Sequence, residues 1–121
     1  MAKFAIRTVL TGYKFDLNAP NGQTIATSEV YETAAACRRG IESVRKNAPK
    51  ARQEDQTDDG CKTVTNPKFE LFQDRNGQFR FRLKSRNGQI IASSGGYTTK
   101  AACENGIACV RSNAPNAEIE S

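Results

Sequence analysis

The sequence predicts an α+β fold built from a tandem duplication of one strand–strand–strand–helix–strand unit. The units are expected to form a single antiparallel sheet with both helices on one face. Three observations carry this prediction: an internal repeat, period-two alternation before each expected helix, and an apolar stripe at helical spacing within it. Residues 13–53 align with residues 79–119 at a constant offset of 66, without a gap, and 21 of the 41 positions are identical. Such regularity indicates two copies of one structural unit.

The 121 residues are enough for one domain with one modest core. Each copy alone would bury so small a fraction of its surface that it would be only marginally stable. We therefore expect a single domain over residues 1–121, with repeats at 1–55 and 68–121 joined by a linker at 56–67. The two repeats are expected to share one core and to be related by a pseudo-twofold axis.

Each repeat opens with a pattern that predicts three strands. Phe79–Lys84 alternates apolar and basic residues with period two, which is typical of a strand with one buried face. Asn76-Gly77 before this strand predicts a two-residue hairpin turn, and Asn87-Gly88 after it predicts a second tight turn. The first copy repeats this order with a shorter first turn at Thr11-Gly12.

A helix is expected next in each repeat. Thr33 and Thr99 are suitable N-caps, because a threonine hydroxyl accepts a hydrogen bond from a free amide of the first turn. The residues that follow at i, i+4, i+7 and i+11 form one apolar stripe: Cys37, Ile41, Val44 and Ala48, and again Cys103, Ile107, Val110 and Ala114. Both helices are expected to end before a proline, Pro49 or Pro115, which pushes the preceding residue out of the helical region.

Two further features of the helical regions bear on packing. Gly40 and Gly106 lie in the middle of the expected helices, where glycine costs about 1 kcal/mol relative to alanine, so both indicate close packing. The polar tails 50–54 and 116–120 that follow the helices are expected to be short strands at sheet edges.

Composition argues against catalysis. The chain contains no histidine, so serine–histidine and cysteine–histidine pairs are impossible, and the cysteine spacing does not suit a zinc site. No glycine-rich phosphate-binding motif is present. We expect no catalytic residues, no metal and no cofactor. Cys37 and Cys103 are expected to be buried and reduced, whereas Cys61 in the linker is expected to react first with a thiol reagent.

The best candidate binding surface is the polar face of the sheet. Lys14, Arg80, Arg82 and Lys84 are expected to form a basic stripe there, in a chain of net charge +5 whose linker is acidic. The preferred hypothesis is a non-enzymatic interaction or structural module that contacts a protein partner. The alternative is weak binding of nucleic acid or another polyanion by the stripe, although no aromatic residues lie beside these charges for base stacking.

Membrane-spanning and secretory segments are not expected. No apolar run approaches the ~20 residues that a membrane helix requires, and the N-terminus lacks the apolar core of a signal peptide. The sequence therefore predicts a cytoplasmic protein, and we expect a monomer.

Several stretches of the second repeat resemble a known family. The matching segments are Phe79–Leu83, Asn87–Ser94, Gly96-Tyr97, Asn105–Ile107, Val110 and Asn113-Ala114. Together they resemble the YegP-like family, small bacterial domains of unknown function, over nearly the whole chain. The resemblance implies that the last strand of each repeat is swapped onto the sheet of the other repeat, and it implies no reaction. The first repeat has Glu29-Val30 in place of Gly95-Gly96, so a binding site that used this bend would be confined to the second repeat.

Overall fold

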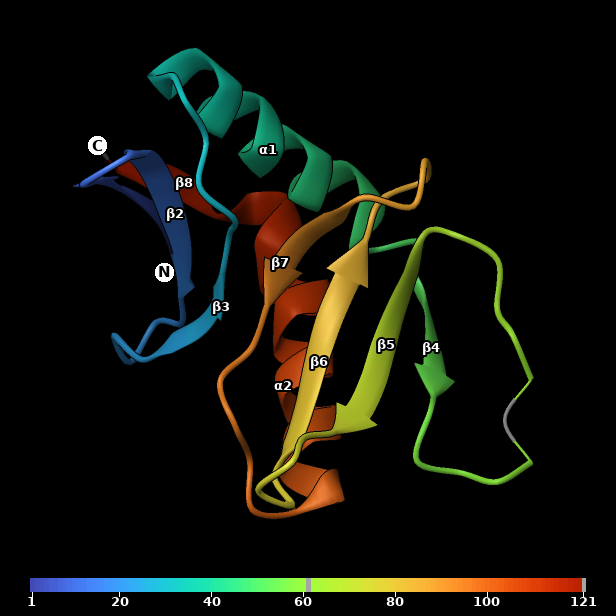
Figure 1. Cartoon of the computed structure of the whole chain (residues 1–121). Helices are drawn as coiled ribbons and strands as arrows, with labels where there is room; N and C mark the ends of the chain where they lie inside the picture. Colours follow the sequence, from blue (N-terminus) through green and yellow to red (C-terminus); the bar gives the residue numbers. More distant parts are fainter. Residues whose placement is uncertain (61, 121) are drawn as a thin grey trace.

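The computed structural model describes residues 1–60 and 62–120, so the expected exposure of Cys61 lies outside the described residues. The fold is α+β (Figure 1). Its elements in chain order are β1 (Lys3–Val9), β2 (Gly12–Asn18), β3 (Thr24–Thr27), α1 (Ala34–Asn47), β4 (Arg52–Asp55), β5 (Lys68–Gln73), β6 (Phe79–Lys84), β7 (Ile90–Ser93), α2 (Lys100–Asn113), a short 3₁₀ helix η1 (Ala114–Asn116) and β8 (Glu118–Glu120).

The strands form one mixed eight-stranded sheet in the order β4-β5-β6-β7-β3-β2-β1-β8. The prediction of an entirely antiparallel sheet is wrong at its two edges, where β4 runs parallel to β5 and β8 runs parallel to β1. Parallel neighbours need a long connection instead of a hairpin. Residues 56–67 supply it between β4 and β5, and β8 is reached through α2 and η1.

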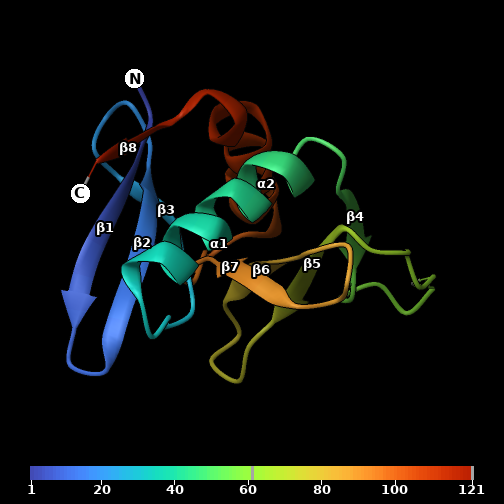
Figure 2. The same ribbon diagram turned by 90° about the horizontal axis from the view of Figure 1, so that it is seen from above.

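Strand pairing is weakest at the centre of the sheet. β3 and β7 are joined by a single residue pair, Thr27 with Ser93. Both helices lie on one side of the sheet, as the view from above shows (Figure 2). α1 contacts both β2 and β7, and α2 contacts both β6 and β3, so each helix bridges the central seam. Helix packing therefore joins the two halves where the strand ladder is weakest.

The core is one continuous apolar cluster. Its largest side chains are Phe4, Phe15, Phe69 and Phe81, none of which is more than 1% exposed. The helical stripes pack onto them, so the predicted burial of Cys37 and Cys103 is confirmed. Burial raises the pKa of the Cys103 thiol to about 11 and that of Cys37 in the same direction. Both thiols are therefore protonated at neutral pH.

The local start and packing of each helix follow the sequence predictions. The hydroxyls of Thr33 and Thr99 accept hydrogen bonds from the amides of Ala36 and Ala102, at 3.0 and 3.1 Å. A Cβ added at Gly40 would lie 2.3 Å from the Tyr31 hydroxyl oxygen, and one added at Gly106 would lie 2.4 Å from the Tyr97 hydroxyl oxygen. The two glycines therefore let each helix approach a tyrosine closely.

Two arginines secure the edge strands. Arg111 on α2 donates a 2.8 Å hydrogen bond to the carbonyl oxygen of Ala51, directly before β4, and its guanidinium lies 5.3 Å from the Phe69 ring centroid. Arg45 on α1 likewise donates to the carbonyl oxygen of Ala117, directly before β8, and lies over Phe4. Each helix thus holds the edge strand that comes from the other half of the chain.

The hairpin turns differ from the two-residue type predicted from Asn-Gly. That type needs two residues with positive φ, and every positive φ among the described residues belongs to glycine. In the β6–β7 turn the Gly88 amide donates to the Ser85 carbonyl at 2.9 Å and the Ser85 amide donates to the Gln89 carbonyl at 2.9 Å. Gly88 itself has φ of +86°. The connection is a type I turn followed by a left-handed glycine. The β5–β6 turn has the same pattern, with the Gly77 amide donating to the Asp74 carbonyl at 3.1 Å and Gly77 at φ of +80°, so it is one residue longer than predicted.

Candidate functional site

Three of the four predicted stripe residues lie together on β6. Phe81 and Leu83 point into the core, so Arg80, Arg82 and Lys84 project from the opposite face. Each is paired with a carboxylate: Arg80 with Asp74 at 2.6 Å, Arg82 with Glu70 at 2.5 Å and Lys84 with Glu70 at 3.4 Å. This part of the stripe is therefore close to electrically balanced.

The fourth stripe residue lies apart from the other three. Lys14 is on β2, in register with Arg7 of β1, and has no carboxylate partner among the described residues. Arg7 is paired with Asp16 at 2.9 Å. The structure thus separates Lys14 from the β6 cations by β3 and β7 and leaves no continuous run of uncompensated charge along this face.

The β6 cations belong to a network that reaches the edge of the sheet. The Lys68 ammonium lies 2.8 Å from a Glu54 carboxylate oxygen and 3.3 Å from one of Glu70, and all three side chains are less than 10% exposed. Hydrogen bonds from Gln56, then from Lys68 and the Val64 amide, lower the pKa of Glu54 to about 2. These groups stay ionised at neutral pH and fix β4 to β5.

Glu70 is at the centre of the network. Its burial acts to raise the pKa of the carboxyl, but hydrogen bonds from Arg82 and Lys68 outweigh burial and hold the pKa below its ordinary value. A buried carboxylate shared by three cations stabilises strand pairing and is poorly available to an external ligand.

In the Gly95-Gly96 bend, packing accounts for Gly96 alone, because no atom lies within 4 Å of a Cβ added at Gly95. Neither glycine has a left-handed φ. A Cβ added at Gly96 would lie 2.1 Å from the Gln78 side-chain oxygen. In the first repeat, Val30 stands at the position of Gly96 and Gly12 at the position of Gln78. The large and the small residue of the pair are therefore exchanged between the repeats. Gly96 therefore accommodates the Gln78 side chain.

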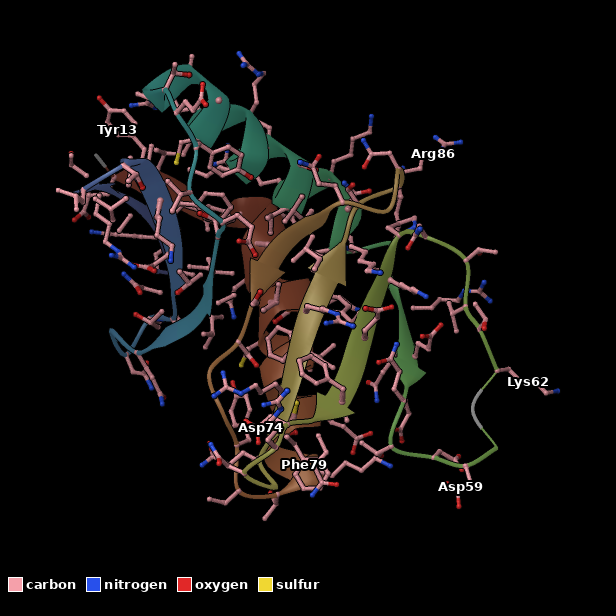
Figure 3. All side chains as sticks on the ribbon, viewed as in Figure 1. Tyr13, Asp59, Lys62, Asp74, Phe79 and Arg86 are labelled. Carbon is pink, nitrogen blue, oxygen red and sulfur yellow. The ribbon has the colours of Figure 1, made fainter. Side chains whose placement is uncertain are left out.

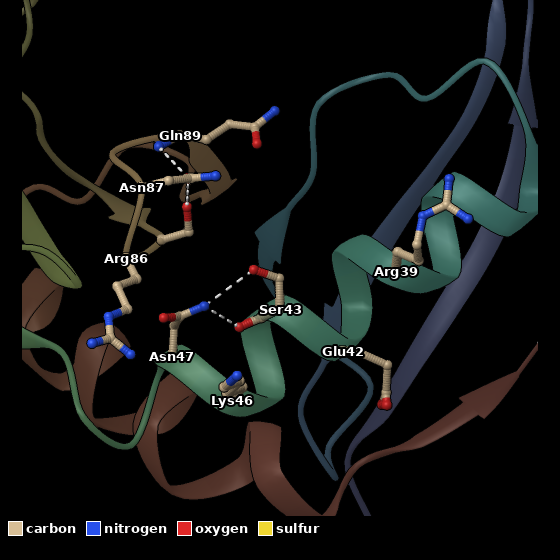
Figure 4. A pocket seen from close by; sticks show the side chains of 9 residues that line it. Arg39, Glu42, Ser43, Lys46, Asn47, Arg86, Asn87 and Gln89 are labelled. Carbon is tan, nitrogen blue, oxygen red and sulfur yellow. Dashed lines mark hydrogen bonds between the residues drawn. The ribbon is translucent and has the colours of Figure 1, made fainter.

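A groove lined by polar side chains lies between the two halves of the chain. It lies between α1 and the β6–β7 turn and has a volume of about 470 Å³ (Figure 4). It is lined by Arg39, Glu42, Ser43, Lys46 and Asn47 from the helix and by Ser85, Arg86, Asn87 and Gln89 from the turn. It exists because α1 of the first half packs against β7 of the second.

Local hydrogen bonds fix both walls of the groove. On the helix, the Asn47 side-chain amide donates to the Ser43 carbonyl at 2.8 Å and to its hydroxyl oxygen at 3.1 Å. In the turn, the Asn87 side-chain oxygen accepts from the Ser85 hydroxyl and, at 3.2 Å, from the Gln89 amide. Both walls are therefore held in shape by their own residues.

The groove carries an excess of positive charge. Arg39, Lys46 and Arg86 are exposed and make no ion pair within the described part of the chain. Arg86 points away from the body of the molecule at the tip of the turn (Figure 3). Glu42, the one acid of the lining, is paired with Arg45 at 2.5 Å. Unlike the β6 stripe, the groove leaves three cations available to an anionic group.

The sequence prediction missed this groove. Its three cations belong to two elements of different halves, and only the fold brings them together. A signal was nevertheless present in the repeat alignment, where the positions equivalent to Arg39, Lys46 and Arg86 hold the neutral residues Asn105, Ser112 and Pro20. A difference in charge at three positions of one repeat indicates a feature that the other repeat does not share.

Apart from Glu42, which is paired with Arg45, the groove side chains are cations, carboxamides and hydroxyls, a set suited to holding an anion or a peptide group. Over residues 1–60 and 62–120 no group of three potential metal ligands is assembled. Within the same residues no helix has the length and apolar character needed to cross a membrane.

Fold and groove together define a small α+β domain in which α1 and the β6–β7 turn build one cationic concavity. The family model described as a domain of unknown function, DUF1508, matches residues 11–55 and 74–121, and the chain belongs to this family.

Curated relatives and a solved structure agree with this assignment. The UPF0339 protein YegP of Shigella flexneri is 39% identical over 108 residues, covering 89% of this chain and 84% of the relative. The UPF0339 protein PA0329 of Pseudomonas aeruginosa is 37% identical over 119 residues, covering 98% and 94%. The solution NMR structure of YegP from E. coli, described as of unknown function, has a TM-score of 0.79 at 33% identity, covering 98% of this chain and 90% of that one. The function of this family is described as unknown.

Proposed function

We propose that this protein is a non-enzymatic interaction module that binds a protein partner through the groove between α1 and the β6–β7 turn. The observation that carries the proposal is the set of three exposed cations, Arg39, Lys46 and Arg86, which line one concavity and lack ion-pair partners among the described residues. Elsewhere on the sheet surface, cations of β5 and β6 are paired with carboxylates.

The non-enzymatic part of the proposal is supported by the chemistry of the groove. Its side chains offer hydrogen-bond donors, acceptors and positive charge, and the hydroxyls of Ser43 and Ser85 are hydrogen-bonded to Asn47 and Asn87 instead of to a base. The hydrogen bonds that hold Asn47 and Asn87 are directed at their own wall, which preserves the shape of the groove. A preformed, open polar groove suits recognition of a partner segment.

Binding of nucleic acid through Lys14, Arg80, Arg82 and Lys84 has less support. Arg80, Arg82 and Lys84 are already ion-paired with Asp74 or Glu70. An electrophoretic shift assay with mixed DNA and RNA over a range of salt concentrations tests this alternative, because binding to phosphates weakens steeply as salt rises.

We also infer that the two halves arose by duplication, are related by a pseudo-twofold axis and exchange their last strands. The pairing of β4 with β5 and of β8 with β1 supports this, as do the reciprocal contacts of Arg45 and Arg111. A cytoplasmic location is supported by the free, buried thiols of Cys37 and Cys103, which suit a reducing compartment.

The proposal is tested by capturing partners from the source cell with three proteins. These are the wild type, a groove variant carrying Arg39→Gln, Lys46→Gln and Arg86→Gln, and a control variant carrying Lys14→Gln, Arg38→Gln and Arg75→Gln. The two variants lose the same charge. We expect quantitative mass spectrometry to find at least one protein that the wild type and the control retain and the groove variant loses. A groove variant with an unchanged set of partners contradicts the proposal.

A further inference from the structure

The positions of the groove cations restrict the shape of the ligand. Arg39 and Lys46 are seven residues apart on α1, which places them on nearly the same face of the helix and about 10 Å apart along its axis. Arg86 belongs to the opposite wall, on the turn (Figure 4). Cations spread over this length do not converge on one small anion, so they suit a chain that carries negative charges at intervals.

Helix stabilisation explains only part of this arrangement. A cation near the C-terminus of a helix interacts favourably with the helix dipole, and Lys46 lies in the last turn of α1. Arg39 lies near the middle of the helix and Arg86 belongs to the other half of the molecule, so neither gains from this effect. Their presence in the same groove is explained better by a shared ligand.

The remaining lining favours a peptide over a nucleic acid. The side-chain oxygen of Asn47, the side-chain nitrogen of Asn87 and the Gln89 carboxamide are not used by the hydrogen bonds that hold the two walls, and such groups match the donors and acceptors of a peptide backbone. None of the nine lining residues is aromatic, whereas single-stranded nucleic acid is held largely by stacking on aromatic side chains. Charge and hydrogen-bonding groups therefore point to the same class of ligand.

We propose that the groove binds an acidic, extended peptide segment of a partner protein, with carboxylates that meet Arg39, Lys46 and Arg86. This inference rests on the proposed function and names its ligand class. In a polyproline II segment, residues three apart lie on the same face about 9 Å from each other, which is close to the spacing of Arg39 and Lys46. Carboxylates at every third residue of such a segment would reach both cations of the helix.

The probe is a fluorescein-labelled peptide of four Glu-Pro-Gly units, compared with a peptide of four Gln-Pro-Gly units. Binding is measured by fluorescence anisotropy at low salt and again near physiological ionic strength. We expect saturable binding of the glutamate peptide that weakens with salt and is about tenfold weaker for the groove variant, because three charged contacts are lost. The control variant, with the same net charge as the groove variant, is expected to bind within about twofold of the wild type.

Three results would overturn the inference: no saturable binding of the glutamate peptide, equal binding of the glutamine peptide, or equal loss of binding in groove and control variants. Tighter binding of an oligothymidylate, lost in the groove variant, would identify a nucleic-acid site instead. Circular dichroism of the variants, whose changed side chains are exposed, separates lost binding from unfolding. If the peptide fails while partner capture still depends on the groove, the proposed function stands and the acidic-peptide assignment fails.

Discussion

The two ends of the sheet carry the same ion pair in opposite surroundings. Lys68 on β5 pairs with Glu54 on β4 at 2.8 Å, and Lys3 on β1 pairs with Glu120 on β8 at 3.0 Å. The register of the two parallel ladders places the pairs at equivalent positions. The first pair is nearly buried, with side chains 9% and 6% exposed, whereas those of the second are 51% and 61% exposed.

The neighbours of each pair explain the difference. Beside Lys68, the sheet continues with Glu70 and Arg82, which extend the network to a third strand. In the first half, Ala5 stands in place of Glu70 and Asp16 in place of Arg82. Alanine has no charged group, so within the described residues the ion-pair network does not extend beyond Lys3 and Glu120. Glu54 is also covered by residues that follow β4, because the amide of Val64 donates to it at 2.7 Å. The same two residue types thus form an integral part of one edge and a surface contact at the other.

The largest effect is expected from removing the weaker edge altogether. Deletion of residues 116–121 removes β8, exposes the backbone of β1 as an unpaired edge and takes away the carbonyl group that accepts from Arg45. Summed over the lost hydrogen bonds, we expect about 5 kcal/mol of lost unfolding free energy, and self-association through β1. Urea unfolding and analytical ultracentrifugation measure these two consequences.

A shorter deletion sharpens this test. Removal of residues 118–121 takes away the β8 ladder but keeps Ala117 and its hydrogen bond with Arg45. We expect this variant to be intermediate in stability. If the longer deletion unfolds like the full chain and stays monomeric, β8 contributes nothing and the strand-exchange inference fails.

The second prediction compares the two lysines directly. Lys68→Met leaves the buried carboxylates of Glu54 and Glu70 without their shared cation, and breaking a buried pair in this way costs about 3–5 kcal/mol. Lys3→Met removes an exposed pair, and we expect no change beyond experimental error. The urea midpoints of the two variants and the wild type measure the difference. Equal midpoints for the two variants would show that burial of the pair has no energetic consequence.

The third prediction uses acid to titrate the buried edge. The pKa of Glu54 is about 2 in the folded protein, below its ordinary value of 4.5. A lowered folded-state pKa means that Glu54 contributes its full stability above about pH 4.5, and that this contribution is lost as pH falls toward 2. We expect the melting temperature of the wild type to fall over this range, and Glu54→Gln to fall less steeply from a lower starting value.

Glu120→Gln is the matched control for the acid experiment, because its carboxylate belongs to the exposed pair with Lys3. It is expected to keep the wild-type steepness. A Glu54→Gln profile parallel to the wild type between pH 5 and 2 would show that the acid sensitivity arises elsewhere.

Sequence patterns predicted the parts of the fold that depend on local chemistry. The threonine caps, the apolar stripes with Cys37 and Cys103 and the helix ends before proline follow from spacing and side-chain type alone. Parallel pairing at the two edges did not follow, because it depends on where a strand lands after a long connection. The turn type was predicted wrongly because Asn-Gly suits a type I turn followed by a left-handed glycine as well as the two-residue hairpin turn.

The candidate surface was harder to predict for a related reason. Period-two alternation correctly places Arg80, Arg82 and Lys84 on one face, but it does not reveal that Glu70 and Asp74 from another part of the sequence neutralise them. The groove cations are 47 residues apart from Arg39 to Arg86 and share no periodicity, so only tertiary packing brings them together.

The smallest effect is expected at the bend before each helix, where the halves exchange a large and a small residue. Gly96→Val would press on Gln78, whose oxygen lies 2.1 Å and whose Cβ lies 3.1 Å from the added Cβ position. The oxygen ends a flexible side chain and can move aside, so we expect a cost of about 1 kcal/mol, at the low end for overpacking. Gln78→Gly in the same chain recreates the Gly12–Val30 pair of the first half and should restore most of the loss. The coupling between the two substitutions is measured by a double-mutant cycle in urea. The outcome that contradicts this account is additivity, in which Gly96→Val costs the same with or without Gln78, because the glycine would then be required for a reason other than room for that side chain.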